Sequence, residues 1–220
     1  MHKITKTVET IRTVKTIENN YIELIETQNE NFDKVILIAG VFHGEEPQGE
    51  YLIKKYLGTD LSHIKNKLII IPCLNPDGKS KNQRQNANGV DLNRNFPTKN
   101  WRVTTRKEYF GGSAPASEIE TKFMIDVLNS YEFDAILSIH APFRVVNYDG
   151  PAKEPAEKIS QITGYPVVCD IGYPTPGSFG NYAGVERNIP VITLELPEEE
   201  TNERLWEVNK GVFDYLACEY

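Results

Sequence analysis

Five short apolar runs constrain the fold of this chain more than any other feature of its sequence. They lie at residues 34–40, 67–74, 134–140, 165–170 and 190–196, and the first reads Lys-Val-Ile-Leu-Ile-Ala-Gly. Apolar runs without polar alternation are typical of strands buried on both faces, as in a parallel sheet covered by helices. Helical patterns lie between the runs, so we predict an α/β fold, a three-layer sandwich around a mixed, mostly parallel sheet.

Three helices are predicted from local signals. One covers residues 47–57 and has Pro47 in its first turn, where a missing N–H costs nothing. A second starts at Ser117 and Glu120, which have the spacing of a capping box. The third covers about 201–219. The apolar faces of the last two consist of Ile119, Phe123, Val127 and Leu128, and of Leu205, Val208, Val212 and Leu216.

Two segments are less regular. Residues 76–113 are rich in Asn, Gly and Pro and form a long loop, and loops of this length in compact domains are usually functional or disordered. The loop opens with the turn sequence Asn75-Pro-Asp-Gly78, for which we expect a structural role. Residues 1–20 have apolar spacing that fits a helix, but their Thr and Val content favours an edge strand.

Composition limits the possible partners. A chain of 220 residues with 40% apolar content fits a single domain, residues 1–220. The net charge of −7 argues against nucleic-acid and anionic-membrane partners, which attract basic surfaces. Cys73, Cys169 and Cys218 lack disulfide or zinc-site spacing, so reduced thiols are expected. Without a leader pattern or a membrane-spanning run, a cytoplasmic location is predicted, and the oligomeric state is left open.

Two histidines and a glutamate follow the ends of two predicted strands. His43 and Glu46 stand three residues apart after the first apolar run, and His140 ends another. Ligands of such sheets bind at the carboxyl ends of the strands, so we expect the three side chains to meet. Two His and one Glu are the ligand set of a catalytic zinc site. The alternatives are a solvated loop pair for His43 and Glu46 and a hydrogen-bonded core histidine for His140.

Further charged residues fit the same site. Glu195 lies between Leu194 and Leu196, where a carboxylate is costly unless it has a partner or a catalytic task. Its alternative is a place at the frayed end of an edge strand. Arg84 and Arg94 in the long loop offer guanidinium groups for a substrate carboxylate or a developing oxyanion. The alternative interpretation is that Arg84 and Arg94 are ordinary loop arginines without a functional role.

The order of these motifs resembles the zinc metallocarboxypeptidases related to carboxypeptidases A and B, over about residues 35–196. The matching segments are His-Gly-Glu-Glu (43–46), GVDLNRNFP (89–97), the helix and strand that lead to His140, and ITLEL around Glu195. The resemblance implies the zinc carboxypeptidase fold and one Zn²⁺ per chain. It also implies that His43, Glu46 and His140 are zinc ligands and that Glu195 is the catalytic base.

The resemblance implies roles for five more residues. Asp91 accepts a hydrogen bond from His43 and orients its ring. Asn93 and Arg94 hold the terminal carboxylate of the peptide, and Arg84 polarises the scissile carbonyl. Tyr173 is a candidate for the mobile tyrosine that covers the substrate in this family.

Within the family, QRQNANGVDLNRNFPTKNW and GYPTPGSFGNYAG are similar to the bacterial murein tripeptide amidases. This similarity implies a small peptide substrate with a free C-terminal carboxylate, the murein tripeptide, cleaved at the γ-D-Glu–meso-diaminopimelate amide bond during peptidoglycan recycling. The second ammonium and carboxylate of diaminopimelate need polar partners, which we expect near Ser178, Phe179 and Asn181.

Three other functions remain open at this stage. A general C-terminal carboxypeptidase would use the same site on ordinary peptides. A zinc deacylase of the succinylglutamate desuccinylase and aspartoacylase type shares H-x-x-E and a later histidine, but accounts less well for GVDLNRNFP. A metal-free peptide-binding relative would keep the pocket without catalysis, and the presence of all four of His43, Glu46, His140 and Glu195 argues against it.

Overall fold

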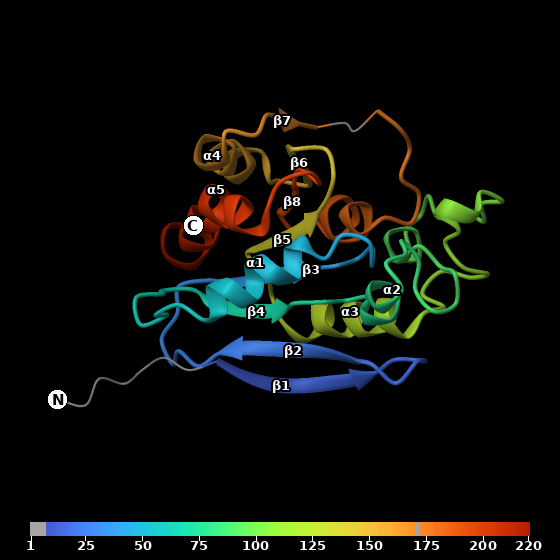
Figure 1. Cartoon of the computed structure of the whole chain (residues 1–220), viewed down its shortest axis with the longest axis horizontal. Helices are drawn as coiled ribbons and strands as arrows, with labels where there is room; N and C mark the ends of the chain where they lie inside the picture. Colours follow the sequence, from blue (N-terminus) through green and yellow to red (C-terminus); the bar gives the residue numbers. More distant parts are fainter. Residues whose placement is uncertain (1–7, 170–171) are drawn as a thin grey trace.

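A computed structural model describes residues 8–169 and 172–220, and within these ranges eight strands form one mixed sheet (Figure 1). The strand order is β1-β2-β4-β3-β5-β8-β6-β7. The central pairs β4–β3, β3–β5 and β5–β8 are parallel, as is β6–β7 at one edge. The remaining three pairs are antiparallel. The predicted mixed, mostly parallel sheet is confirmed.

The elements follow one another along the chain with strands and helices interleaved. The strands are β1 Val8–Lys15, β2 Tyr21–Thr27, β3 Val35–Gly40, β4 Lys67–Ile71, β5 Ala135–His140, β6 Val145–Asp149, β7 Val167–Val168 and β8 Val191–Glu195. The α-helices are α1 Gln48–Leu57, α2 Pro76–Ser80, α3 Ile119–Ser130, α4 Lys153–Thr163 and α5 Asn202–Asp214. Short 3₁₀ turns are η1 Leu92–Arg94 and η2 Lys107–Tyr109, and π-helical turns are η3 Gly180–Glu186 and η4 Tyr215–Glu219.

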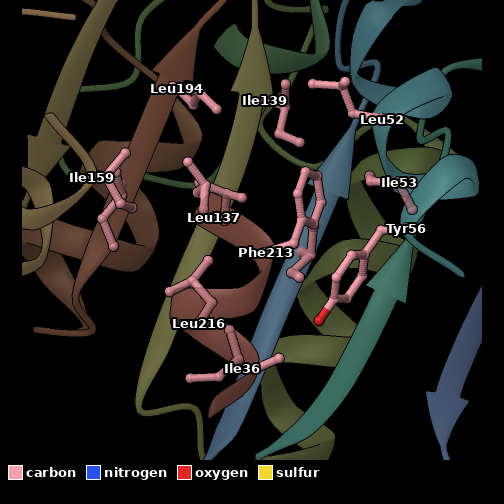
Figure 2. Close-up of a cluster of buried hydrophobic side chains, with 14 of the residues drawn as sticks. Ile36, Leu52, Ile53, Tyr56, Leu137, Ile139, Ile159, Leu194, Phe213 and Leu216 are labelled. Carbon is pink, nitrogen blue, oxygen red and sulfur yellow. The ribbon is translucent and has the colours of Figure 1, made fainter. Parts of the chain in front are cut away.

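Strand β3 shows why the fold has three layers. Its residues are almost all buried, and Ile36 and Ile38 face one hydrophobic cluster while Leu37 and Ala39 face another. The first cluster packs β3, β5 and β8 against α1, α4 and α5, and Figure 2 shows Phe213 of α5 beside Tyr56 of α1. The second cluster packs the opposite face against α3. Since side chains alternate along a strand, an unbroken apolar run requires cover on both faces.

Four of the five predicted buried strands are present as β3, β4, β5 and β8, and the strand predicted at 165–170 is wrong. There the described chain has only the two-residue β7, half-buried at the edge of the sheet, and residue 170 lies outside the described residues. The prediction also missed β2, β6 and α4, and it assigned the short helix α2 to the long loop. In β2 each exposed residue is followed by a buried one over its first half, so it has one solvent-facing side and no apolar run.

The N-terminal prediction holds for the described part of the segment. β1 is an edge strand that pairs antiparallel with β2, and residues 1–7 lie outside the described residues. The Asn75-Pro-Asp-Gly78 turn has the expected structural role. Asn75 accepts from the Gly78 N–H, while buried Asp77 accepts from Thr16 and from Asn20, which ties the β1–β2 hairpin to the loop.

The three predicted helices are present, but the capping box is wrong. Helix α3 begins after Glu118 without a side-chain cap, because the Ser117 hydroxyl donates to the Glu118 carboxylate instead. Ile119 is partly exposed, at 37% of its surface, whereas Phe123, Val127 and Leu128 are buried as predicted. In helix α5 the Thr201 side chain accepts from Arg204 N–H, and α5 continues into η4.

Two further expectations concern cysteines and membranes. All three cysteines are unpaired, as predicted, with Cys73 buried and Cys169 exposed. In the described part of the chain, no helix combines the length and the apolar character needed to span a bilayer.

Candidate metal and active site

The carboxyl ends of β3, β5 and β8 bring the predicted site residues to one edge of the sheet. His43 and Glu46 lie between β3 and α1, His140 is the last residue of β5, and Glu195 is the last residue of β8. His140 and Glu195 are register partners, because β5 and β8 are parallel neighbours. Parallel strands end at the same edge, so residues separated by up to 152 positions share one site.

The turn after β3 has an unusual backbone. Val41 has a φ of 55°, a conformation that costs a β-branched residue of the order of 1–3 kcal/mol and that clusters at functional sites. Gly44 packs against α2 so closely that a Cβ atom there would lie 2.1 Å from the Gly78 carbonyl carbon. Only glycine therefore fits at position 44 of this turn.

The Glu46 carboxylate lies between the two histidine rings. Its Oε1 is 2.8 Å from His43 Nδ1, and its Oε2 is 3.0 Å from His140 Nδ1. All three side chains are buried, and their ligand atoms lie within 4.8 Å of one another. Among the residues that the structure describes, this is the one group of three or more His, Cys, Asp or Glu side chains close enough to hold a metal ion.

Asp91 decides which ring nitrogen of His43 is free. Its fully buried carboxylate lies 3.1 Å from His43 Nε2, and an ionised carboxylate only accepts hydrogen bonds. Nε2 therefore carries the hydrogen, and in a neutral ring Nδ1 holds a lone pair aimed at Glu46. Two acceptors at 2.8 Å require a proton or a metal cation between them. The donor set thus fits a divalent cation that prefers nitrogen and carboxylate ligands.

The charges around His43 also favour a bound cation at this site. Burial disfavours the charged ring, but the carboxylates of Glu46 and Asp91 outweigh burial and raise the pKa of His43 to about 9. Burial also opposes ionisation of Glu46 and Asp91. Yet His43 and His140 hold the pKa of Glu46 well below its usual range, and His43 and Arg84 do the same for Asp91. Without a metal cation, a proton on His43 offsets part of the negative charge of the two carboxylates, and a cation that binds must displace it.

Glu195 is a buried carboxylate with an unused oxygen. Its side chain is 8% exposed, and its Oε2 atom has no hydrogen-bond partner in the described residues. Burial raises the pKa of Glu195 and outweighs the lowering effect of His140, and the Glu46 carboxylate makes a smaller contribution in the raising direction. A carboxylate that is costly to bury and unpaired next to a cation site has the properties of a general base.

Arg84 lies beside the same group of residues. Its Nε donates to Asp91 Oδ2 at 2.9 Å, and its Nη1 is 3.8 Å from Glu46 Oε1. The carboxylate of Asp91 therefore links a predicted metal ligand to the arginine predicted to polarise the carbonyl.

Asn93 and Arg94 follow on η1. The Asn93 carboxamide oxygen accepts from the Phe179 N–H at 2.8 Å, and Arg94 donates to the Asn93 carbonyl oxygen at 2.6 Å. Arg94 is 6% exposed, so its charge is concentrated in the site and not dispersed in solvent. The ring of Tyr109 lies near both arginines, 5.3 Å from the Arg84 guanidinium and 5.6 Å from that of Arg94. Sequence reasoning missed Tyr109, because nothing in the pattern of the loop distinguishes it.

Tyr173 faces this group from a separate segment. Its side chain is 41% exposed, and burial raises its pKa against the lowering effect of Arg94 and Arg84. Together with Arg94 and Tyr109 it lines a cavity of about 610 Å³. A role as a substrate cover remains a prediction.

The other predicted substrate contacts have structural partners. Phe179 is 2% exposed and packs against Phe96 and against Phe42, which itself stacks on the His140 ring. The Asn181 amide donates to the Thr175 carbonyl oxygen and to the Ser178 hydroxyl. These contacts hold the segment in place, and substrate binding by Ser178 and Phe179 remains a prediction.

Comparison with known proteins identifies the family. The zinc carboxypeptidase family model matches residues 2–163, which include His43, Glu46, Asp91 and His140. Murein peptide amidase A of Escherichia coli strain K12 is 32% identical over 180 residues, which cover 76% of this chain and 73% of that protein. Murein peptide amidase A of Vibrio campbellii is 35% identical over 141 residues, 58% of this chain and 56% of that protein.

Solved structures agree with this result. The structure of murein-tripeptide amidase from Escherichia coli O157 superposes with a TM-score of 0.81 at 26% identity, and covers 97% of this chain and 93% of that one. Carboxypeptidase A from Helicoverpa armigera, at 19% identity, has a TM-score of 0.74 over 96% of this chain and 67% of its own. The latter shows the shared fold alone. The match over most of the sequence places the chain in the zinc carboxypeptidase family, whose members are hydrolases of peptide bonds.

Proposed function

We propose that this chain is a zinc-dependent hydrolase that cleaves the amide bond before the C-terminal residue of a murein peptide. The observation that carries the proposal is the group of His43, Glu46 and His140 beside Glu195, a buried carboxylate with an unpaired oxygen. Three protein ligands with an adjacent base are the arrangement of catalytic zinc sites. A zinc ion held there supplies the Lewis acidity that makes water nucleophilic near neutral pH.

The side chains of the protein divide the remaining work. Glu195 takes a proton from the attacking water and returns it to the amine nitrogen as the carbon–nitrogen bond breaks. Arg84 stabilises the negative charge that develops on the carbonyl oxygen, and Asp91 holds both Arg84 and His43 in position. Since Asp91 joins these two side chains, its loss affects the cation site and the oxyanion partner together.

Arg94 and Asn93 select the end of the peptide. The buried guanidinium of Arg94 offers charge-assisted hydrogen bonds to a terminal carboxylate, and an amidated terminus would leave this charge unpaired. The bond cleaved is therefore the last amide bond of the substrate peptide. We further propose that Tyr173, which lines the same cavity as Arg94, covers the bound peptide.

Similarity to murein peptide amidases supports the choice of substrate. The match to the Escherichia coli protein includes 76% of this chain at 32% identity, and the structural neighbour of 26% identity is also a murein-tripeptide amidase. The proposed substrate is L-Ala-γ-D-Glu-meso-diaminopimelate, and the proposed product is free diaminopimelate. A role in peptidoglycan recycling stays a prediction. A cytoplasmic location also stays a prediction, which cell fractionation of the native host can test.

The test compares three substrates with the zinc-loaded protein: the murein tripeptide, an ordinary peptide with a free C-terminus and an N-acyl amino acid. Release of diaminopimelate, abolished by a chelator and restored by zinc, is the expected result. Cleavage of ordinary peptides without release of diaminopimelate would replace the proposal with a general carboxypeptidase. Cleavage of the N-acyl amino acid alone would indicate a deacylase, and zinc binding without any turnover a peptide-binding protein.

A further inference from the structure

The cavity of about 610 Å³ beside the metal site is strongly cationic. Its walls include three arginines, Arg94, Arg102 and Arg106, together with Tyr109 and Tyr173. The described residues that line it include no Asp or Glu. The chain as a whole carries a net charge of −7, so this concentration of positive charge is local.

The three arginines differ in their surroundings. Arg94 is buried and bonded to the backbone beside Asp91, whereas Arg102 and Arg106 are exposed on the loop between η1 and η2. Within the described residues, neither Arg102 nor Arg106 takes part in an ion pair. One carboxylate on Arg94 therefore leaves two guanidiniums in the same cavity without an anionic partner.

Hydrogen bonds next to the cavity join the two segments that line it. Phe96 N–H donates to the Gly177 carbonyl oxygen at 3.0 Å, and Gly177 N–H donates to the Thr98 hydroxyl at 3.1 Å. A Cβ atom on Gly177, where φ is 72°, would lie 2.3 Å from the Arg94 carbonyl oxygen. The segment with Tyr173 is thus fixed against the loop that carries the arginines, which makes the cavity a preformed site and not a gap between free loops.

We propose that Arg102 and Arg106 form a second anion subsite, which binds a carboxylate at the far end of the side chain of the released residue. The inference rests on the proposed function, in which Arg94 takes the carboxylate next to the cleaved bond. Substrates that fit both subsites end in a residue with two carboxylates. Among murein peptides, these are the peptides that end in diaminopimelate.

Lysine-ending peptides are the informative contrast. Lysine has the ammonium group of diaminopimelate but lacks its distal carboxylate. Its side chain would place a cation near two guanidiniums with no compensating anion, which costs affinity in addition to the lost ion pairs. The subsite therefore separates two murein tripeptides that share the same scissile bond and the same terminal carboxylate.

The test measures kcat/KM for tripeptides that end in meso-diaminopimelate or in L-lysine, with the parent and with the double variant Arg102→Gln and Arg106→Gln. The matched control is Lys99→Gln with Lys107→Gln, which removes two exposed charges, one from the same loop and one from the start of η2, but none from the cavity wall. Since both arginines are exposed, we expect a fall of about ten-fold for the diaminopimelate peptide. The value for the lysine peptide stays constant or rises, and the control keeps the selectivity of the parent.

An unchanged ratio between the two tripeptides in the arginine variant, at parental zinc content and melting temperature, would overturn the subsite while the proposed function stands. If the parent cleaves neither tripeptide, the proposed function fails. The subsite is then tested by comparing kcat/KM for peptides that end in Glu with kcat/KM for peptides that end in Gln. Loss of a preference for Glu over Gln in the arginine variant alone supports the subsite. Retention of that preference, or its absence in the parent, refutes the subsite.

Discussion

Replacement of Glu195 by Gln tests the catalytic assignment most directly. Gln has nearly the same shape, so its carbonyl oxygen can keep the hydrogen bond that the Phe143 N–H donates to the Glu195 carboxylate. The unpartnered Oε2 atom becomes an NH₂ group that cannot accept a proton. Glu195 is not among the three grouped ligand residues, so the variant should still bind one zinc ion per chain.

The size of the effect follows from the role of the group. A positioned general base contributes typically 10²- to 10⁴-fold, so kcat should fall by at least about 100-fold. KM should change little, because the terminal carboxylate is assigned to Arg94 and Asn93. The stability of the variant at pH 7 should equal or exceed that of the parent, because the substitution removes a buried charge whose pKa is raised by burial.

The assay combines release of the C-terminal amino acid with zinc content and thermal unfolding on the same preparation. Glu207→Gln on α5 is the matched control, since Glu207 is exposed and its ion-pair partner within the described residues is Lys210, and its variant should retain parental kcat. Parental turnover in the Glu195 variant would show that another group is the base. Loss of zinc together with turnover would show that Glu195 belongs to the metal site.

Three further predictions concern other residues of the site and its support. Asp91→Asn should weaken zinc affinity about 10- to 100-fold, measured by competition with a chelator, and unchanged affinity would show that Asp91 does not orient His43. Arg94→Ala should lower kcat/KM about 10- to 100-fold for peptides with a free C-terminus, and an equal loss for C-terminally amidated peptides would contradict its role. Burial raises the pKa of fully buried Glu120 to about 7, above the unfolded value near 4.5, so the folded chain holds the extra proton and stability falls as pH rises through this window. Denaturant unfolding at pH 5 and pH 8 should show a loss of roughly 1–4 kcal/mol in the parent, and the same slope in Glu120→Gln would rule out Glu120 as its origin.

The apolar runs predicted the central strands, because burial on both faces leaves β3 without polar side chains and β5 with only Ser138 and the site residue His140. Strands with one solvent-exposed side, such as β2, lack that signal and were missed. The strand predicted at 165–170 failed for the opposite reason: apolar residues beside an edge can be half-buried without forming a long ladder, as β7 shows.

The sequence alone was enough to predict which types of residue form the site. His43, Glu46, His140 and Glu195 each follow or end a strand, and the rule that parallel strands end at one edge is enough to bring them together. What the sequence could not supply are the contacts of the long loop. The link from Arg84 to Asp91, the contact of Tyr109 with two arginines and the convergence of Arg102 and Arg106 on one cavity all depend on loop packing. Loops have no periodic pattern of buried and exposed residues, so the course of this loop is set by distant partners such as Gly177, which only the tertiary structure brings within reach.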